Sequence, residues 1–278
     1  MVTLQPKDRI MVALDVSDPD KAARLVEQLS PHVGGCKYGL EYGHAMEYNL
    51  LVTEEEEDAI KSLRAYRRQH RAVAKLSFKD GKLHDIPNTV EKASICIAKS
   101  GVKMFNVHCL GGPKMMEAAA KAAKTMDPRP LVIGVTVLTS LSYDDFARMG
   151  IYLGSSEVFS RYSGDALEIE KASCLRRLVL SLAVLAQKCG LDGVVCSPQE
   201  ARLIREQCGP DFLLVTPGIR SKNAPPDDQK RTMTAGQAIR EGADILVIGR
   251  PITGAPDPVE AAKGFTDEIA ETLKEMGQ

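Results

Sequence analysis

The sequence predicts a single (β/α)8 (TIM) barrel with surface insertions, spanning residues 1–278, and three observations carry this prediction. Short, continuous apolar runs recur along the chain, the gaps between them can each hold a helix, and polar residues follow the runs. Continuous apolar strands that alternate with helices are typical of a parallel sheet buried on both faces. A length of 278 residues suits one such barrel, which commonly uses about 250 residues.

Eight runs rich in valine, isoleucine and leucine are the expected strands. They cover residues 10–14, 36–40, 73–78, 102–107, 131–138, 193–196, 212–215 and 245–248. An open, doubly wound sheet is the alternative arrangement of alternating strands and helices. That alternative is less well supported, because no GxGxxG motif follows the first run.

Helices are expected between these strands wherever capping residues and helical spacing coincide. Residues 17–29 begin at a capping serine and carry Leu25, Val26 and Leu29 at helical spacing. In residues 197–207, Ser197 is the expected N-cap and Pro198 lies in the first turn. The other expected helices cover residues 89–100, 114–123, 235–241 and 258–274.

Two segments are longer than a minimal barrel needs. Residues 41–70 carry an acidic block and then a basic block, which is typical of a solvated helical face. Residues 142–175 contain Gly150, Gly154 and Gly164, which we expect to interrupt any helix there. Both segments are expected to be surface insertions, and the second could also cover an active site.

Composition limits the classes of partner. A formal net charge of -1 gives no electrostatic reason to expect nucleic acid or an anionic membrane. No apolar run approaches the ~20 residues of a membrane span, and the amino terminus lacks the apolar core of a signal peptide. The seven cysteines form no CxxC pair, so reduced thiols in a cytoplasmic protein are expected.

Polar residues cluster where the expected strands end. In a (β/α)8 barrel the carboxyl ends of the strands share one face, and active sites are built there. The residues that should converge on this face are Asp15, Lys37, Asp80, Lys82, Asp85, Thr139, Arg220 and Arg250. His84 and His108 are instead expected to be hydrogen-bonded core residues, and no HxH or HxxxH spacing predicts a metal site.

The converging residues divide into two groups. Two pairs of a glycine and an arginine follow the last two strands: Gly218 with Arg220, and Gly249 with Arg250. These pairs predict a phosphate site. Glycine lets backbone N–H groups approach an anion, and arginine binds it bidentately. Turn glycines beside solvated arginines are the alternative. The other group contains Lys37, Asp80, Lys82 and Asp85, and predicts catalysis by charge, with a structural ion-pair network as its alternative.

The ten residues that begin at Asp80 and end at Thr89 read DGKLHDIPNT, which resembles the DxKxxDIPNT signature of the orotidine 5'-phosphate decarboxylase family. The resemblance covers nearly the whole chain in order. The other matching segments are residues 13–15, 37–39, 106–108, 111–112, 135–140, 190–197, 215–220, 228–229 and 248–250.

The resemblance implies decarboxylation of orotidine 5'-monophosphate to uridine 5'-monophosphate (UMP), the last step of de novo pyrimidine synthesis, with no metal or organic cofactor. Asp80 would lie against the substrate carboxylate and Lys82 would protonate C6 of the pyrimidine. Lys37 and Asp85 would complete an alternating charge array.

The resemblance also implies a homodimer with shared active sites. Asp85 and Thr89 would each reach the neighbouring subunit's site. The remaining implied contacts are Asp15 and Lys37 with the ribose, Thr139 with the pyrimidine edge, and Arg220, Gln229, Gly249 and Arg250 with the phosphate.

Two other activities are compatible with parts of this pattern. Metal-dependent sugar-phosphate decarboxylases and hexulose-phosphate synthases share the DxKxxD spacing but lack the Ile-Pro-Asn-Thr continuation found here. A non-catalytic nucleotide-binding barrel would be expected to lose Asp80 or Lys82, and both are present. The sequence departs from the family pattern in its two long segments and at Gly81, where bulkier apolar residues are usual.

Overall fold

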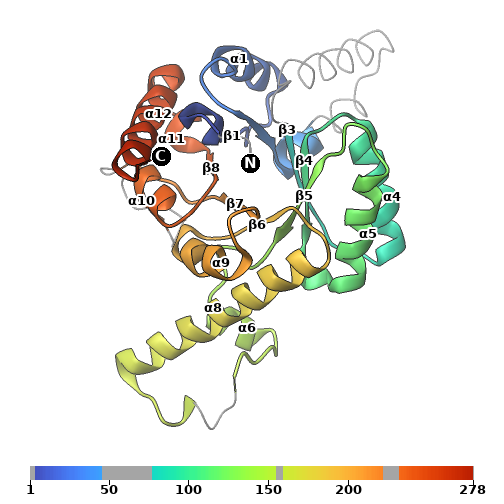
Figure 1. Ribbon diagram of the computed structural model, residues 1–278, viewed down its shortest axis with the longest axis vertical. Helices are drawn as coiled ribbons and strands as arrows, with labels where there is room; N and C mark the ends of the chain where they lie inside the picture. The colour runs from blue at the N-terminus through green and yellow to red at the C-terminus, as the bar shows by residue number, and fades with distance from the viewer. Residues whose placement is uncertain (1–3, 46–76, 155–158, 222–231, 278) are drawn as a thin grey trace.

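The computed structural model describes residues 4–45, 77–154, 159–221 and 232–277 (Figure 1). Within these residues, parallel strands β1 to β8 pair in sequence order and close into a barrel. The strands are β1 (Ile10–Ala13), β2 (Gly35–Tyr38), β3 (Ser77–Leu83), β4 (Met104–His108), β5 (Leu131–Val135), β6 (Gly193–Val195), β7 (Leu213–Thr216) and β8 (Ile245–Ile248). The expected barrel is confirmed.

Closure of the barrel explains why the strands read as continuous apolar runs. Strand β1 pairs with β2 on one side and with β8 on the other, where Met11 lies opposite Val247. Every residue of β1, β4 and β8 is buried, because one face of each strand lines the barrel interior and the other packs under the helices. Met11, Phe78, Met104 and Ile133 belong to one buried cluster drawn from different strands.

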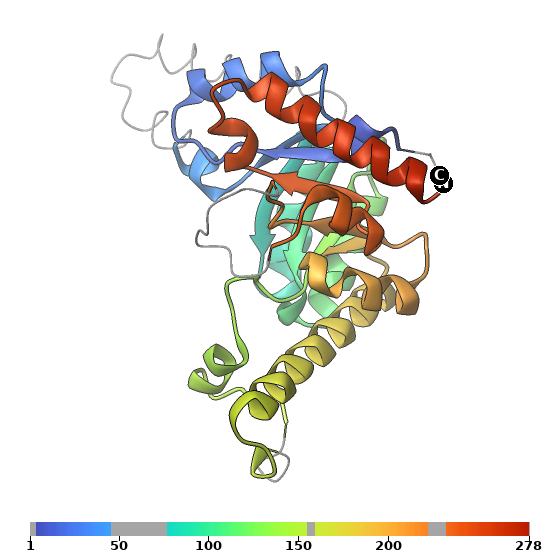
Figure 2. The ribbon, with the colours of Figure 1, turned by 90° about the vertical axis from the view of Figure 1, so that its left-hand side faces the viewer.

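Helices surround the sheet in both views (Figures 1 and 2). The main ones are α1 (Pro19–Leu29), α4 (Pro87–Lys99), α5 (Pro113–Lys124), α6 (Tyr143–Arg148), α8 (Gly164–Lys188), α9 (Ala201–Cys208), α10 (Ala235–Arg240), α11 (Arg250–Thr253) and α12 (Pro258–Glu275). Among the helices that the structure describes, none combines the length and the apolar character needed to cross a membrane.

Side-chain caps fix where the helices begin. The expected cap of the first helix was wrong by one residue: Asp18, rather than Ser17, accepts hydrogen bonds from the backbone N–H groups of Asp20 and Lys21. Aspartate at this position also places a negative charge at the positive end of the helix dipole. The Ser197 cap is confirmed, and Glu200 bonds back to the backbone N–H of Ser197.

The third strand differs from its expected extent. Strand β3 runs through to Leu83, so Asp80 and Lys82 lie within the strand rather than after it. The start of the expected strand, before residue 77, falls outside the described residues. The pairing of β3 with β4 shifts between Lys79 and Leu83, which marks a bulge.

The second long segment forms more helix than expected. Helix α8 begins at Gly164 and runs for 25 residues, so this glycine starts a helix instead of interrupting one. The first turns of α8 and the short helix α6 extend beyond the barrel (Figure 2), which confirms a surface insertion. None of the described residues that line the cavity at the carboxyl ends of the strands comes from residues 142–175, so the structure gives no support for a cover over that cavity. Most of the other segment, residues 41–70, lies outside the described residues.

Candidate active site

A cavity of about 490 Å³ lies among the residues at the carboxyl ends of the strands. Its size is typical of a small-molecule site. The structure brings together eight of the expected site residues in its lining: Asp15, Lys37, Asp80, Lys82, Thr139, Arg220, Gly249 and Arg250. Their positions follow from the topology, because parallel strands in a closed barrel all point the same way.

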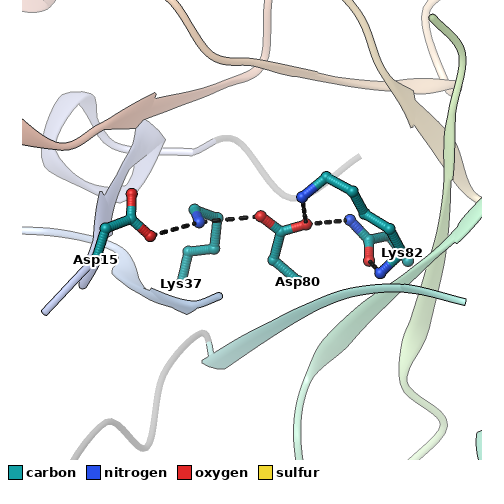
Figure 3. A network of polar contacts seen from close by, with 5 residues as sticks. Asp15, Lys37, Asp80 and Lys82 are labelled. Atoms are coloured by element: carbon teal, nitrogen blue, oxygen red, sulfur yellow. Dashed lines mark hydrogen bonds and ion pairs between the residues drawn. The ribbon is translucent and has the colours of Figure 1, made fainter. Parts of the chain in front are cut away.

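Four of these residues form a row of alternating charge across the cavity (Figure 3). Lys37 Nζ lies 3.2 Å from Asp15 Oδ1 and 2.9 Å from Asp80 Oδ2. The other oxygen of that carboxylate, Asp80 Oδ1, lies 2.8 Å from Lys82 Nζ. The row therefore reads Asp15, Lys37, Asp80, Lys82. The first three residues come from different parts of the chain, and Lys82 lies in the same strand as Asp80.

The charged forms of the two central groups are strongly favoured. Burial alone would raise the pKa of Asp80, but the ammonium groups of Lys37 and Lys82 and the hydrogen bonds from Lys82 and Asn106 lower it to about 2. Burial would lower the pKa of Lys37, but Asp80 and Asp15 outweigh it and the net pKa is raised. The side chain of Lys37 and that of Asp80 are each only 11% exposed, so water screens this pair weakly.

Asn106 is a site residue that the sequence reasoning missed. It lies in β4, is 1% exposed, and donates from Nδ2 to Asp80 Oδ1 at 2.7 Å. Its Oδ1 accepts a hydrogen bond from the backbone N–H of Lys82, also at 2.7 Å. A polar residue inside an otherwise apolar strand was the available signal, since a buried amide needs partners for both ends.

The backbone at Lys82 has an unusual conformation for a lysine. Its φ is 46°, in the left-handed region that residues other than glycine seldom adopt. Strained backbone of this kind gathers at functional sites, where the surroundings hold it in place. Here the hydrogen bond to Asn106 is one such restraint.

The same cavity is also lined by expected phosphate-binding residues. Gly218, Arg220, Gly249 and Arg250 all line it, close to Pro217. Gly218 has a φ of 80°, so a side chain at this position would be strained. Arg220 follows β7 and Arg250 follows β8, and guanidinium groups can bind an anion bidentately. The remaining expected phosphate ligand, Gln229, lies outside the described residues.

Two expected site residues do not reach this cavity. Asp85 and Thr89 are exposed, and neither is among the described lining residues. Asp85 Oδ1 accepts a hydrogen bond from the N–H of Ile86, which is itself 65% exposed. These residues follow β3 at the start of α4, on the surface of this chain.

The two histidines near the site stack on each other. Their ring centroids are 5.3 Å apart and the ring planes differ by 17°. His108 is buried and accepts a long hydrogen bond from the N–H of Leu110, as expected, and burial, His84 and Lys82 lower its pKa. The expectation for His84 was wrong, because His84 is exposed. Across the described ranges, no three potential ligand side chains cluster as a metal site would require.

Comparison with known proteins agrees with this geometry. Residues 8–265 match the model of the orotidine 5'-phosphate decarboxylase / HUMPS family. The chain is 42% identical over 275 residues to orotidine 5'-phosphate decarboxylase from Moorella thermoacetica, covering 97% of this chain and 95% of that protein. It is 41% identical over 271 residues to the enzyme of that name from Geotalea daltonii, covering 95% and 97%.

Solved structures give the same result. The crystal structure of orotidine 5'-phosphate decarboxylase from Lactobacillus acidophilus superposes with a TM-score of 0.68 and 31% sequence identity, covering 94% of this chain and 98% of that one. The enzyme from Pyrococcus horikoshii, at 21% identity and a TM-score of 0.63, shares the fold. The chain therefore belongs to the orotidine 5'-phosphate decarboxylase / HUMPS family.

Proposed function

We propose that this chain decarboxylates orotidine 5'-monophosphate to UMP, using the row of alternating charges as its catalytic group. The single observation that carries the proposal is that the Asp15–Lys37–Asp80–Lys82 row lies in the same cavity as Arg220 and Arg250. A nucleotide carries both a phosphate and a base, so a cavity with both sets of side chains suits it.

The chemistry requires a fixed positive charge at one carbon. When the bond between C6 and the carboxylate breaks, its electron pair remains on C6 in an orbital that cannot delocalise into the ring. The Lys82 ammonium, held 2.8 Å from Asp80, can stabilise that carbanion without reorganising. Lys82 then transfers one Nζ proton to C6, which gives UMP and a neutral amine that solvent reprotonates.

Asp80 has a second role in this proposal. Its low pKa keeps it negatively charged beside the substrate carboxylate, which it repels, whereas neutral CO2 is not repelled. The repulsion diminishes as CO2 forms, so it favours the transition state over the bound substrate. Asp15 and Lys37 are proposed to contact the ribose, and Thr139 to contact the pyrimidine edge.

The phosphate would supply binding energy remote from the reacting carbon. Arg220, Gly249 and Arg250 line the cavity, and we propose that they hold the phosphate together with Gln229. Interactions with the phosphate can hold the substrate in register with the charged row.

Replacing Arg250 with alanine should weaken binding more than chemistry. The loss of a bidentate bond to a phosphate costs about 1.5–3 kcal/mol, so kcat/KM should fall by about tenfold to a hundredfold. Steady-state kinetics with orotidine 5'-monophosphate and with orotidine, which lacks the phosphate, would test this. Arg148→Ala, on the exposed insertion, is the matched control. An equal effect of Arg250→Ala on both substrates would show that Arg250 does not bind the phosphate.

We also propose that the active form is a homodimer in which Asp85 and Thr89 enter the partner's site. Both residues are exposed at the start of α4 beside Ile86, a large apolar side chain that is 65% exposed. Lys82 would then be flanked by two carboxylates. Asp80 would come from its own chain and Asp85 from the partner subunit.

One assay separates the proposal from its alternatives. The purified chain is incubated with orotidine 5'-monophosphate in excess EDTA, and UMP formation is followed. Turnover in EDTA supports the metal-free decarboxylase. Turnover only after magnesium is added would favour the metal-dependent sugar-phosphate chemistry, and binding of UMP without any turnover would favour the non-catalytic barrel.

The proposal includes a cytoplasmic location, which rests on the cysteines. All seven are free thiols, and all except Cys96 are buried. Burial raises the pKa of Cys36 and that of Cys109 to about 12. Inert, unpaired thiols of this kind are usual in a reducing compartment.

A further inference from the structure

Asn106 faces a break in the pairing of two strands. Strand β3 pairs with β4 at Lys79 opposite Phe105, and next at Leu83 opposite Val107. Between these two pairs, residues 80–82 of β3 face the single residue Asn106 of β4, so the regular ladder is interrupted at Lys82. The side-chain oxygen of Asn106 accepts that N–H at 2.7 Å. The amide thus replaces a ladder hydrogen bond where the bulge has removed one.

The same side chain also holds the carboxylate that anchors the lysine. Asp80 Oδ1 accepts from Asn106 Nδ2 at 2.7 Å and from Lys82 Nζ at 2.8 Å. Asn106, Asp80 and Lys82 therefore form a closed ring in which one amide fixes both ends of Lys82: the backbone directly, and the ammonium through Asp80. Both polar ends of the buried Asn106 are used in this ring.

We propose that Asn106 is a positioning residue for the decarboxylation, which aims the Lys82 ammonium at the reacting carbon by holding the left-handed backbone of Lys82 and the carboxylate of Asp80. This inference rests on the proposed function. Its physical basis is that a catalytic charge acts without reorganisation only if its direction is fixed before the substrate binds. The proposed phosphate-binding residues Arg220, Gly249 and Arg250 follow β7 and β8 rather than β4, so substrate binding should depend little on Asn106.

Two substitutions separate the two hydrogen bonds. Asn106→Asp keeps an oxygen for the Lys82 N–H but loses the donor to Asp80. Asn106→Ser is too short to keep either bond and introduces no charge. Each should lower kcat by about tenfold to a hundredfold, the size expected when a hydrogen bond to a charged group is lost, while the dissociation constant for UMP changes by less than about threefold.

The aspartate variant also has a signature in pH. Asp80 is faced by Lys37 from β2, by Lys82 from β3 and by Asn106 from β4, with Asp15 beyond Lys37 and both His84 and His108 near Lys82. A second carboxylate in place of Asn106 would share a proton with Asp80 and raise the apparent pKa of the pair. Protonation disables Asp80. As the pH is lowered, the loss of kcat should therefore begin at a higher pH in Asn106→Asp than in the wild type. Asn106→Ser should show no comparable shift.

Ser77→Ala is the matched structural control. Ser77 is a buried polar residue on β3, the strand next to that of Asn106, and its Oγ accepts a hydrogen bond from the N–H of Lys103, away from the cavity. It should lower the melting temperature but leave kcat unchanged. Wild-type turnover tests the proposed function separately, so the variants are compared only once that turnover is measured.

Two results would overturn the proposal. The first is a wild-type kcat in folded Asn106→Ser. The second is a parallel loss of kcat, UMP affinity and melting temperature in both Asn106 variants, which would show that Asn106 only stabilises the fold. If Asn106→Asp does not fold, Asn106→Ser alone still decides between these results.

Discussion

Lys82→Ala should lower kcat by about 10⁴-fold or more while UMP still binds. The change removes two contributions at once: a fixed charge beside the carbanion, which is worth about 10²–10³-fold, and a proton donor, which is worth about 10²–10⁴-fold. The proposed phosphate-binding residues are unaltered, so the dissociation constant for UMP should change by much less than kcat. Removal of the ammonium also leaves Asp80 with one fewer partner.

The measurement is single-turnover decarboxylation together with UMP titration on the same preparation. Lys121→Ala is the matched control, because Lys121 is an exposed lysine on α5. It should be indistinguishable from the wild type. Retention by Lys82→Ala of more than about a hundredth of the wild-type kcat would remove Lys82 as the proton donor.

Asp85→Ala should abolish most activity by itself, yet regain it when paired with Lys82→Ala. If Asp85 enters the partner's site, a mixed dimer of these two variants has one site with both substitutions and one site with neither. The competent site contains Lys82 from one chain and Asp85 from the other. A mixed dimer should therefore show about half of the wild-type activity, although each parent variant is nearly inactive.

The two variants would be co-expressed with different affinity tags and the mixed dimer purified over both. Asp165→Ala in place of Asp85→Ala is the control, because Asp165 is an exposed aspartate on the insertion. Its mixed dimer with Lys82→Ala retains one unaltered site whether or not the sites are shared. A mixed dimer of Lys82→Ala and Asp85→Ala with no more activity than its parents would contradict shared sites, and a wild-type kcat in Asp85→Ala alone would remove Asp85 from catalysis.

The barrel could be predicted from the sequence because most of its strands are buried on both faces. That burial makes strands such as β1 and β8 continuous apolar runs, and β8 occupies the expected residues 245–248. Once the strands are known, the topology alone brings Asp15, Lys37 and Arg250 to one face. Residues that are far apart in the sequence could be assigned to one site without any knowledge of their side-chain contacts.

The local geometry of the site could not be predicted in the same way. The bulge in β3 and the left-handed backbone of Lys82 depend on a partner that is 24 residues away in sequence. Apolar patterning marks Asn106 as a polar residue in a buried strand but does not show which groups it contacts, so Asn106 was not identified as a site residue. Helix α8 was misjudged for a related reason: a glycine interrupts a helix only when it lies inside one, and Gly164 lies at the start.

The central claim is that one cavity holds the nucleotide with C6 against Lys82 and the phosphate against Arg250. A crystal structure of the wild-type chain with UMP tests it most directly. We expect Lys82 Nζ to be the cation nearest to C6, and the phosphate to contact Gly249 and Arg250, with Asp85 of the partner subunit beside the same lysine. A nucleotide bound in the reverse direction, with its base against Arg250, or bound outside this cavity, would contradict the account.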